Sequence, residues 1–413
     1  MDSFSQVFLR TLQLRSHASP ALPPGECRAS NSRICSLCHA SAVTYDEEAS
    51  ARDTALKEYL RSLRLPGTVR GLVRSPLGRN YRTTSKRKTY EARHEVRLAL
   101  IDPSDRSGGR GSDVAACGIE PASHAAIFRR IQESMQKPFA RPLVESLRYV
   151  IIRGNYETYT VIFNVGEIDG PLVKSANTLS KGLTHDLPAV TGVMLFEDTS
   201  DGRYYLGTRN PASRASVRKI YGETDIQVRY GDKNFLWPAL GFSQINGALV
   251  DSLIEGAARL LRPDPATAFH DLYCGYGLFT LTVGAAAKSA TGIERSAESV
   301  DAAVANAKRQ RATGVRFLRN DISAETVAAM ARGIREGDLL LLDPARTGTG
   351  PGVIETLAAR KPGRIVHLFC NIDLLDAELD RWKKSGYRPE EIIPFDMFPG
   401  TDEVELMTLL VPA

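Results

Sequence analysis

Beyond Pro238, short apolar runs alternate with stretches of helical periodicity. Six runs of four to eight residues predict strands, and Glu298–Gln310, between two of them, has the spacing of a helix. Strands that alternate with helices predict an α/β fold with a mostly parallel, doubly wound sheet. The predicted strands are Thr267–Leu272, Ser289–Ile293, Val315–Leu318, Leu339–Leu342, Arg364–Phe369 and Val404–Val411.

A different pattern fills the middle of the chain, from about Ile127. Here the β-rich runs are separated by turn residues, namely Gly154-Asn155, Asp201-Gly202 and Gly231-Asp232. Short turns of this composition join antiparallel strands. We therefore expect a mainly antiparallel α+β module that shapes a substrate cleft. Its paired runs are Tyr149–Ile152 with Thr158–Phe163, Val193–Phe196 with Tyr204–Leu206, and Ile226–Tyr230 with Phe235–Trp237.

The first part of the chain is less periodic. A helix is predicted over Glu47–Leu63, because apolar residues recur there at helical spacing before Pro66 and Gly67 end it. The three patterns predict three domains: an N-terminal region over residues 1–125, the central module over 126–237 and the doubly wound domain over 238–413.

Composition narrows the class of protein. The chain has 413 residues, of which 43% are hydrophobic and 24% charged, and this excludes a wholly disordered or fibrous protein. Its longest apolar runs, such as Leu339–Leu342, are far shorter than the ~20 residues of a membrane-spanning helix. Met1–Pro20 has no continuous apolar core of a secretory signal, although its arginines leave an organelle transit peptide as an alternative. We expect a cytoplasmic protein without a membrane partner.

The basic charge of the chain is concentrated in one segment. Net charge is +5, but Lys57–Arg97 holds 12 Lys/Arg against 3 Asp/Glu, an excess of +9. Tyr59, Tyr81 and Tyr90 lie among these charges. Basic groups neutralise phosphates and aromatic rings stack on unpaired bases, so the segment predicts contact with RNA loops or single strands. The alternative is a solvated surface, which is common for a run of charges.

Four of the six cysteines form a candidate metal site. Cys27, Cys35 and Cys38 lie within twelve residues, and Cys117 is the fourth. Clustered thiols in a reducing compartment favour a metal site over disulfides. Four thiolates suit either a tetrahedral zinc ion or an iron–sulfur cluster, and the spacing alone does not choose.

Glycine and acidic residues follow successive predicted strands of the C-terminal half. Asp271-Leu-Tyr-Cys-Gly-Tyr-Gly277 comes after the first strand, Glu294 ends the second, Asn320-Asp321 the third and Asp343-Pro-Ala-Arg346 the fourth. Open α/β sheets bind ligands beyond the carboxyl ends of their strands, where an acidic side chain accepts from ribose hydroxyls. Each residue alone could be a turn former, but the series predicts a nucleoside-binding face.

In these motifs, and in others listed below, the chain resembles the S-adenosylmethionine-dependent RNA uracil-C5 methyltransferases. The resemblance covers essentially the whole chain and implies a class I, Rossmann-like methyltransferase domain. It rests on Gly241-Phe-Ser-Gln-Ile-Asn246, Asp271-Leu-Tyr-Cys-Gly275, Gly292-Ile-Glu294, Leu342-Asp-Pro-Ala-Arg346, Phe369-Cys-Asn371, and Asp396-Met-Phe-Pro399 followed by Val404-Glu405.

The resemblance implies cofactor contacts and a catalytic pair. S-Adenosylmethionine would be bound by Gln244, Tyr273, Gly275, Glu294, Asp321 and Asp343. Leu278 stands where the family often has a polar residue. Cys370 would add to uracil C6, the C5 atom would take the methyl group, and Glu405 would remove the C5 proton.

Two features of the sequence bear on this pair. A lone cysteine is more often a buried small apolar residue, but Cys370 is accompanied by the other motifs; Cys274 is expected to be such a packing residue. Family members usually carry His-Thr-x-His before the valine that precedes the base. Here the stretch is Gly400-Thr-Asp-Glu403, and both histidine positions are replaced.

Relatives with four cysteines in a similar arrangement bind a [4Fe–4S] cluster, so the resemblance implies this cluster at Cys27, Cys35, Cys38 and Cys117, with zinc as the alternative. Some family members begin with a small β-barrel domain, and this chain has no room for it before Cys27. In this respect the chain is similar to the shorter 23S ribosomal RNA enzymes. We therefore expect ribosomal RNA as substrate, tRNA as the alternative, and a catalytically silent RNA-binding relative as the non-enzymatic rival. No obligate protein partner is evident, and a monomer is the simplest expectation.

Overall fold

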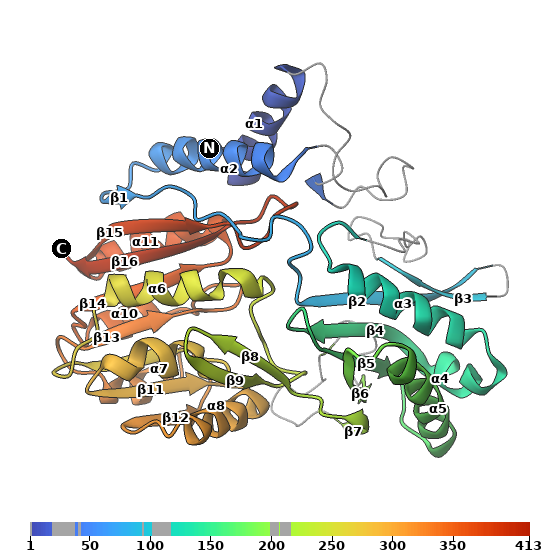
Figure 1. Ribbon diagram of the computed structural model, residues 1–413. Coiled ribbons are helices and arrows are strands. Elements are labelled where there is room, and N and C mark those ends of the chain that lie inside the picture. The colour runs from blue at the N-terminus through green and yellow to red at the C-terminus, as the bar shows by residue number, and fades with distance from the viewer. Residues whose placement is uncertain are drawn as a thin grey trace.

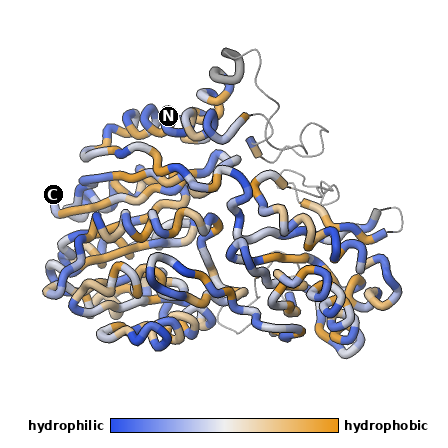
Figure 2. The backbone as a smooth tube through the Cα atoms, in the orientation of Figure 1, coloured by the Kyte–Doolittle hydropathy of each residue, from blue (hydrophilic) through white to orange (hydrophobic). Residues whose placement is uncertain are grey.

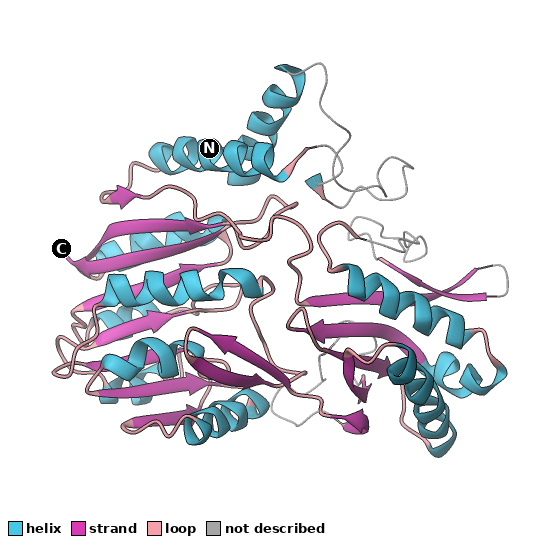
Figure 3. Cartoon of the chain, in the orientation of Figure 1, coloured by secondary structure: helices cyan, strands magenta, loops and turns pink. Residues whose placement is uncertain are grey.

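The computed structural model describes residues 2–18, 38–39, 43–92, 95–100, 117–198, 206 and 216–413. Figure 1 shows two bodies of secondary structure side by side, one built on the C-terminal half and the other on the central part of the chain. Helices flank a sheet in each of them (Figure 3).

The C-terminal body is an eight-stranded sheet of order β1-β15-β16-β14-β13-β10-β11-β12. Every strand pair is parallel except the two pairs made by β16, which is antiparallel to both β14 and β15. This confirms the predicted α/β fold with a mostly parallel sheet. The strands are β1 (Thr68–Val69), β10 (Ala268–Leu272), β11 (Ser289–Glu294), β12 (Val315–Arg319), β13 (Leu339–Leu342), β14 (Arg364–Phe369), β15 (Tyr387–Phe395) and β16 (Glu405–Pro412).

Helices cover both faces of this sheet. One apolar core packs α6, α7 and α8 against the strands, and another packs α1, α2, α9, α10 and α11. Strands buried on both sides are apolar throughout, as in the four consecutive leucines of β13, and Figure 2 shows apolar segments running along the strands. The helices are α1 (Phe4–Ala18), α2 (Tyr45–Ser62), α6 (Val250–Leu261), α7 (Leu278–Thr282), α8 (Ala297–Arg309), α9 (Val327–Met330), α10 (Val353–Ala358) and α11 (Leu375–Lys384), with 3₁₀ turns at Gly247–Leu249, Val283–Ala286, Ala331–Gly333 and Ile372–Leu374.

The predicted N-terminal helix is confirmed as α2. It begins at a capping box in which the Thr44 side chain accepts from the Glu47 backbone N–H and the Glu47 carboxylate accepts from the Thr44 backbone N–H. Two buried ionisable residues, Glu48 and Arg52, lie on its inner face beside the expected alanines and leucines.

The central body is a six-stranded sheet of order β3-β2-β4-β5-β6-β7. It is mainly antiparallel, as predicted, with one parallel pair, β5 and β6, joined by a crossover through α5. The predicted turn at Asp201-Gly202 lies outside the described residues. The elements are β2 (Thr84–Ala92), β3 (Glu95–Ala99), β4 (Leu147–Gly154), β5 (Tyr159–Val165), β6 (Val190–Glu197), β7 (Val217–Gly222), α3 (Ala122–Met135), α4 (Arg141–Ser146), α5 (Gly170–Asp186) and a 3₁₀ turn at Pro138–Ala140.

The third predicted hairpin forms a separate two-stranded sheet of β8 (Ile226–Tyr230) and β9 (Lys233–Trp237). Its turn contains Gly231 at a φ of +56°, a left-handed conformation that glycine adopts without strain. The buried side chains of Tyr230, Phe235 and Trp237 belong to the core of the C-terminal sheet. The hairpin therefore packs with that sheet, although it follows the central one in sequence.

Candidate active site

The predicted site residues converge on one edge of the C-terminal sheet. Parallel strands end at the same edge, so the residues that follow β10, β11, β13 and β14 become neighbours. These are Tyr273, Glu294, Asp343 and Cys370, and Glu405 joins them because antiparallel β16 begins where β14 ends.

The glycine loop after β10 and the acidic end of β11 form one unit. Tyr273, Gly275 and Gly277 all have positive φ angles, of +67°, +54° and +87°. The Gly275 N–H donates to Glu294 Oε2 at 3.2 Å, and the Ser296 N–H donates to Glu294 Oε1 at 2.7 Å. A Cβ atom on Gly275 would meet nothing within 4 Å. The loop thus faces open space directly beside a fixed carboxylate.

Two further acidic residues lie behind this loop. The Thr280 hydroxyl donates to Asp271 at 2.5 Å, and burial raises the pKa of Asp271 to about 7. The Gln244 amide donates to Asp343 Oδ2 at 3.3 Å, which connects the Gly241–Asn246 motif with the strand-end series. Burial also raises the pKa of Asp343.

Asp321, the last member of the predicted series, is exposed after β12. Burial raises the pKa of Tyr273 to about 12, and the charges of Glu378 and Asp321 add to this effect. An electrostatic effect of this kind requires proximity. Both residues follow strands of the C-terminal sheet, Tyr273 after β10 and Asp321 after β12.

Strand register brings Cys370 and Glu405 together. In the antiparallel pair of β14 and β16, Phe369 lies opposite Leu406. The next residue on each chain is Cys370 and Glu405, and opposite residues of such a pair have Cα atoms about 4.5–5.5 Å apart. Glu405 is 2% exposed, whereas Cys370 is half-buried. A thiol that solvent can reach is thus placed against a carboxyl that it cannot.

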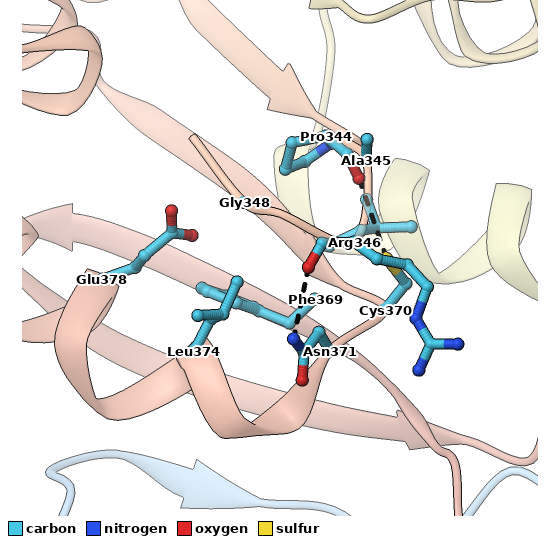
Figure 4. A pocket seen from close by; sticks show the side chains of 10 residues that line it. Pro344, Ala345, Arg346, Gly348, Phe369, Cys370, Asn371, Leu374 and Glu378 are labelled. Atoms are coloured by element: carbon cyan, nitrogen blue, oxygen red, sulfur yellow. Dashed lines mark hydrogen bonds between the residues drawn. The ribbon is translucent and has the colours of Figure 1, made fainter. Parts of the chain in front are cut away.

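Two hydrogen bonds join Cys370 and its neighbour to the loop after β13. The Cys370 thiol donates to the Pro344 carbonyl at 3.8 Å, and the Asn371 amide donates to the Arg346 carbonyl at 3.2 Å. Figure 4 shows both bonds at a small pocket beside the thiol. The pocket is lined by Pro344, Ala345, Arg346, Gly348, Leu368, Phe369, Cys370, Asn371, Leu374 and Glu378.

The electrostatics of the pair favour protonated forms. Burial raises the pKa of Cys370 to about 12, the charges of Glu405 and Asp343 raise it further, and Arg346 acts in the opposite direction. Burial and the charge of Asp343 raise the pKa of Glu405 well above its ordinary value. A thiol with such a pKa is protonated at neutral pH, so it must lose its proton when substrate binds.

Arg346 and Asn371 were quoted in sequence motifs but not predicted as functional residues. Arg346 is the cation beside Cys370, and its side chain pairs with Glu403. The signal that could have identified it is its place three residues after Asp343, at the carboxyl edge where functional residues gather. One other expectation agrees with the structure, since Cys274 is buried beneath the glycine loop. Leu278, which stands where the family often has a polar residue, is buried in the core.

The predicted metal ligands are placed in part. Cys38 and Cys117 pack against the same small group of Tyr81 and Ile119. Burial raises the pKa of Cys117 to about 12, with further increases from Glu120 and Cys38. Cys27 and Cys35 lie outside the described residues. Within the part of the chain that the structure describes, no three His, Cys, Asp or Glu residues form a group that could hold a metal ion. The four-cysteine site stays a prediction.

The basic segment corrects one interpretation of the sequence. Tyr59 and Tyr81 were predicted to stack on RNA bases, but they are 6% and 1% exposed and belong to the core. Several of the cations also pair with carboxylates outside the segment, so the local excess of charge is partly neutralised. These pairs are Lys57 with Asp53, Arg70 with Glu391, Arg74 with Asp46, Arg79 with Glu48, and Arg87 with Glu120.

No helix among the described residues has the length and hydropathy to cross a membrane.

Comparison with known proteins identifies similar sequences. A model described as tRNA (Uracil-5-)-methyltransferase matches residues 208–412. An uncharacterized RNA methyltransferase of Halalkalibacterium halodurans is 32% identical over 192 residues, which are 46% of this chain and 41% of that relative. A second from the same bacterium is 24% identical over 95% of this chain and 84% of its own length.

A solved structure shows the same fold. The tRNA (uracil-54, C5)-methyltransferase of Pyrococcus abyssi, in complex with S-adenosyl-L-homocysteine, superposes with a TM-score of 0.67 at 20% identity, over 90% of this chain and 84% of that one. The Rossmann-like methyltransferase fold expected from the sequence is thereby confirmed. The chain is thus similar to the tRNA (uracil-5-)-methyltransferase family over its C-terminal half and to RNA methyltransferases along nearly its full length.

Proposed function

We propose that this protein methylates C5 of a uracil base in RNA, with S-adenosylmethionine as the methyl donor. The observation that carries the proposal is the register of β14 and β16, which sets a half-exposed thiol, Cys370, opposite a buried carboxyl, Glu405. Methylation at C5 needs a nucleophile for C6 and a base for the C5 proton. The strand ends supply both on the cofactor side of the sheet.

The residues around the glycine loop fit S-adenosylmethionine. Gly275 leaves open space in front of the loop, and Glu294 is fixed by two backbone N–H groups in a position to accept from ribose hydroxyls. Tyr273, Asp321, Gln244 and Asp343 would complete the contacts. When bound, the cofactor supplies an electrophilic methyl group.

Each catalytic residue has a defined task. The Cys370 thiolate forms a bond to uracil C6, and the π electrons of C5=C6 move toward the C4 carbonyl oxygen. C5 would then form its bond to the methyl carbon while the bond from that carbon to the sulfonium sulfur of the donor breaks, with the electron pair left on the sulfur and the C4 carbonyl restored. Glu405 takes the proton from C5, C5=C6 forms again from that C–H bond, and the Sγ–C6 bond breaks to release the thiolate. The raised pKa of Glu405 makes its carboxylate a stronger base for this last step.

The RNA substrate has two candidate classes. The sequence resemblance favours large-subunit ribosomal RNA, whereas the family description and the Pyrococcus abyssi structure name tRNA. In either class the target uridine must leave its stack to reach a thiol recessed at the sheet edge.

The proposal is tested with transcripts of tRNA and of large-subunit ribosomal RNA that contain 5-fluorouridine. Fluorine at C5 leaves no proton to remove, so we expect a covalent protein–RNA adduct on a denaturing gel with the RNA that is the substrate. Cys370→Ala should form none, and Cys274→Ala, which removes another thiol of the same domain, should form it normally. An adduct that persists in Cys370→Ala would refute the mechanism. RNA binding without methylation of either unmodified transcript would favour a catalytically silent relative.

We also propose that Cys27, Cys35, Cys38 and Cys117 bind a [4Fe–4S] cluster. The support is the close packing of Cys38 and Cys117, which the chain brings together from widely separated positions. Protein purified without oxygen should be brown and contain iron, and Cys117→Ser should lose both the colour and the metal. A colourless protein that contains zinc would refute the cluster and leave the zinc site.

A further inference from the structure

The loop that leads into Glu405 is held by side chains of helix α2. The Arg52 guanidinium donates to two backbone carbonyls of this loop, those of Glu403 at 2.5 Å and Thr401 at 2.6 Å. The Gly400 N–H donates to the Glu48 carboxylate at 2.6 Å. These three bonds connect residues more than 340 positions apart in the sequence, and Figure 1 shows the loop after β15 reaching toward α1 and α2.

The side chains that make these bonds are fixed in place. Arg52, Glu48 and Asp396 are all fully buried. Arg52 pairs with Glu48 at 2.7 Å and with Asp396 at 3.2 Å, and Arg79 pairs with Glu48 at 2.8 Å. Two cations therefore face two carboxylates in a dry environment, where the attraction between opposite charges is stronger than in water.

The N-terminal segment encloses the loop on its remaining sides. The His39 N–H donates to the Gly400 carbonyl at 2.7 Å. Gly400 has a φ of +91°, and a Cβ atom there would lie 2.9 Å from Ile119 Cγ2 and 3.5 Å from Cys38 Cβ. The Phe8 ring of α1 lies 4.5 Å from the Arg52 guanidinium. Gly400, the first residue of the loop, is therefore closely surrounded by residues from the N-terminal part of the chain.

We infer that Arg52 is a positioning residue for the base Glu405, acting through the Gly400–Glu403 backbone. The inference rests on the proposed function. One residue, the buried Val404, separates the last carbonyl that Arg52 binds from Glu405, so a shift of that carbonyl moves the start of β16. Where the family usually carries histidines, this chain fixes the loop from outside, through an arginine of another segment.

The test separates removal of the C5 proton from the earlier steps. With an unmodified substrate RNA, slow proton removal makes the covalent adduct accumulate on a denaturing gel, whereas methyl transfer in a single turnover does not depend on it. In Arg52→Lys, which keeps the charge but cannot reach both carbonyls, we expect kcat to fall about tenfold or more because the base is misplaced. The adduct fraction should rise while the single-turnover methylation rate stays unchanged.

Two further variants complete the experiment. Thr54→Ala removes an exposed hydroxyl of the same helix, outside the basic segment, and should change none of the three quantities. Glu48→Gln keeps an acceptor for the Gly400 N–H and should show a smaller rise of the adduct fraction. If Arg52→Lys does not fold, this variant tests whether α2 positions the loop. A proportional loss of adduct, methylation and turnover would mean a purely structural role and overturn the inference. A parent protein that forms no adduct even with 5-fluorouridine RNA would overturn the proposed function, and the inference with it.

Discussion

Two clusters of ionisable side chains lie on either side of the loop between β15 and β16. They differ in the balance of acidic and basic members. On the α2 side, Arg52 and Arg79 face Glu48 and Asp396, so each carboxylate has a guanidinium within reach. On the sheet edge, Cys370, Asp343 and Glu405 gather three acidic groups, and the nearest cation, Arg346, is largely exposed.

The difference separates a group that holds structure from one that performs chemistry. Burial raises the pKa of Asp396, but Arg52 acts against it. At the sheet edge the acidic groups raise one another's pKa instead, and two of them, Cys370 and Glu405, are the groups that lose and accept a proton in the proposed reaction. Balanced charge gives rigidity, and unbalanced charge gives groups with perturbed proton affinity, a common property of active sites.

The largest expected effect is on the nucleophile. Cys370→Ala should lower methylation of the substrate RNA by about 10⁴-fold or more, because no other group can form the bond to C6. Incorporation of a radioactive methyl group from S-adenosylmethionine into RNA measures it. Residual turnover within tenfold of the parent would assign the nucleophile to another residue.

Glu405→Gln should lower turnover by about 10²–10⁴-fold, since the amide cannot accept the C5 proton. The adduct with ordinary uridine should persist. The free energy of unfolding should not fall, because burial already disfavours a charge at this position, as the raised pKa of Glu405 indicates, and glutamine is a neutral isostere. Urea unfolding measures stability on the same samples, and a marked loss would place Glu405 among the structural groups.

The cluster of Arg52, Arg79, Glu48 and Asp396 should lose stability when one of its members is replaced. Arg52→Met leaves two buried carboxylates with a single cation, and breaking a buried pair costs about 3–5 kcal/mol. Urea unfolding of this variant beside Asp343→Asn, which removes one charge from the unbalanced group, gives the direct contrast. Equal losses in both variants would erase the distinction between the two groups.

The last expected effect is that of pH. Burial raises the pKa of Cys370 to about 12, so below that value the thiolate fraction rises with pH. The rate of adduct formation with 5-fluorouridine RNA should increase about tenfold per unit between about pH 6 and pH 9. A stopped time course on denaturing gels measures it. A rate independent of pH would show that the thiol is already ionised in the complex.

Much of the C-terminal fold could be predicted because its strands are buried on both faces and are therefore uninterrupted apolar runs. β15 was missed since Pro389, Glu390, Glu391 and Pro394 interrupt its pattern. Helix α5 was also missed, although it had readable signals: the Asp169 side chain caps it and Pro171 lies in its first turn.

The site could be predicted only as far as strand ends determine it. A motif after a strand reveals which edge a residue occupies, so the place of Asp343 and Cys370 at this edge could be predicted. The roles of Cys370 and Glu405 rest on the family resemblance and stay predictions. The role of Arg52 could not be predicted, because its partners lie some 350 positions away and the sequence of a helix does not indicate such distant contacts. The prediction that Tyr59 and Tyr81 stack on RNA bases was wrong for another reason. Tyrosines among basic residues are typical of an RNA-binding surface, but whether they are exposed depends on tertiary packing, which the local sequence does not reveal.

The antiparallel direction of β16 has a consequence for the evolution of this chain. Side chains alternate between the two faces of a strand, so one residue inserted between Leu406 and Leu410 would turn Glu405 away from Cys370 while every strand pair survived. A residue inserted at the Ser385-Gly386 turn, before β15, would not change the alternation of side chains along β16, so Glu405 would still face Cys370. Length variation is therefore tolerable at the far end of the sheet and forbidden within its last strand.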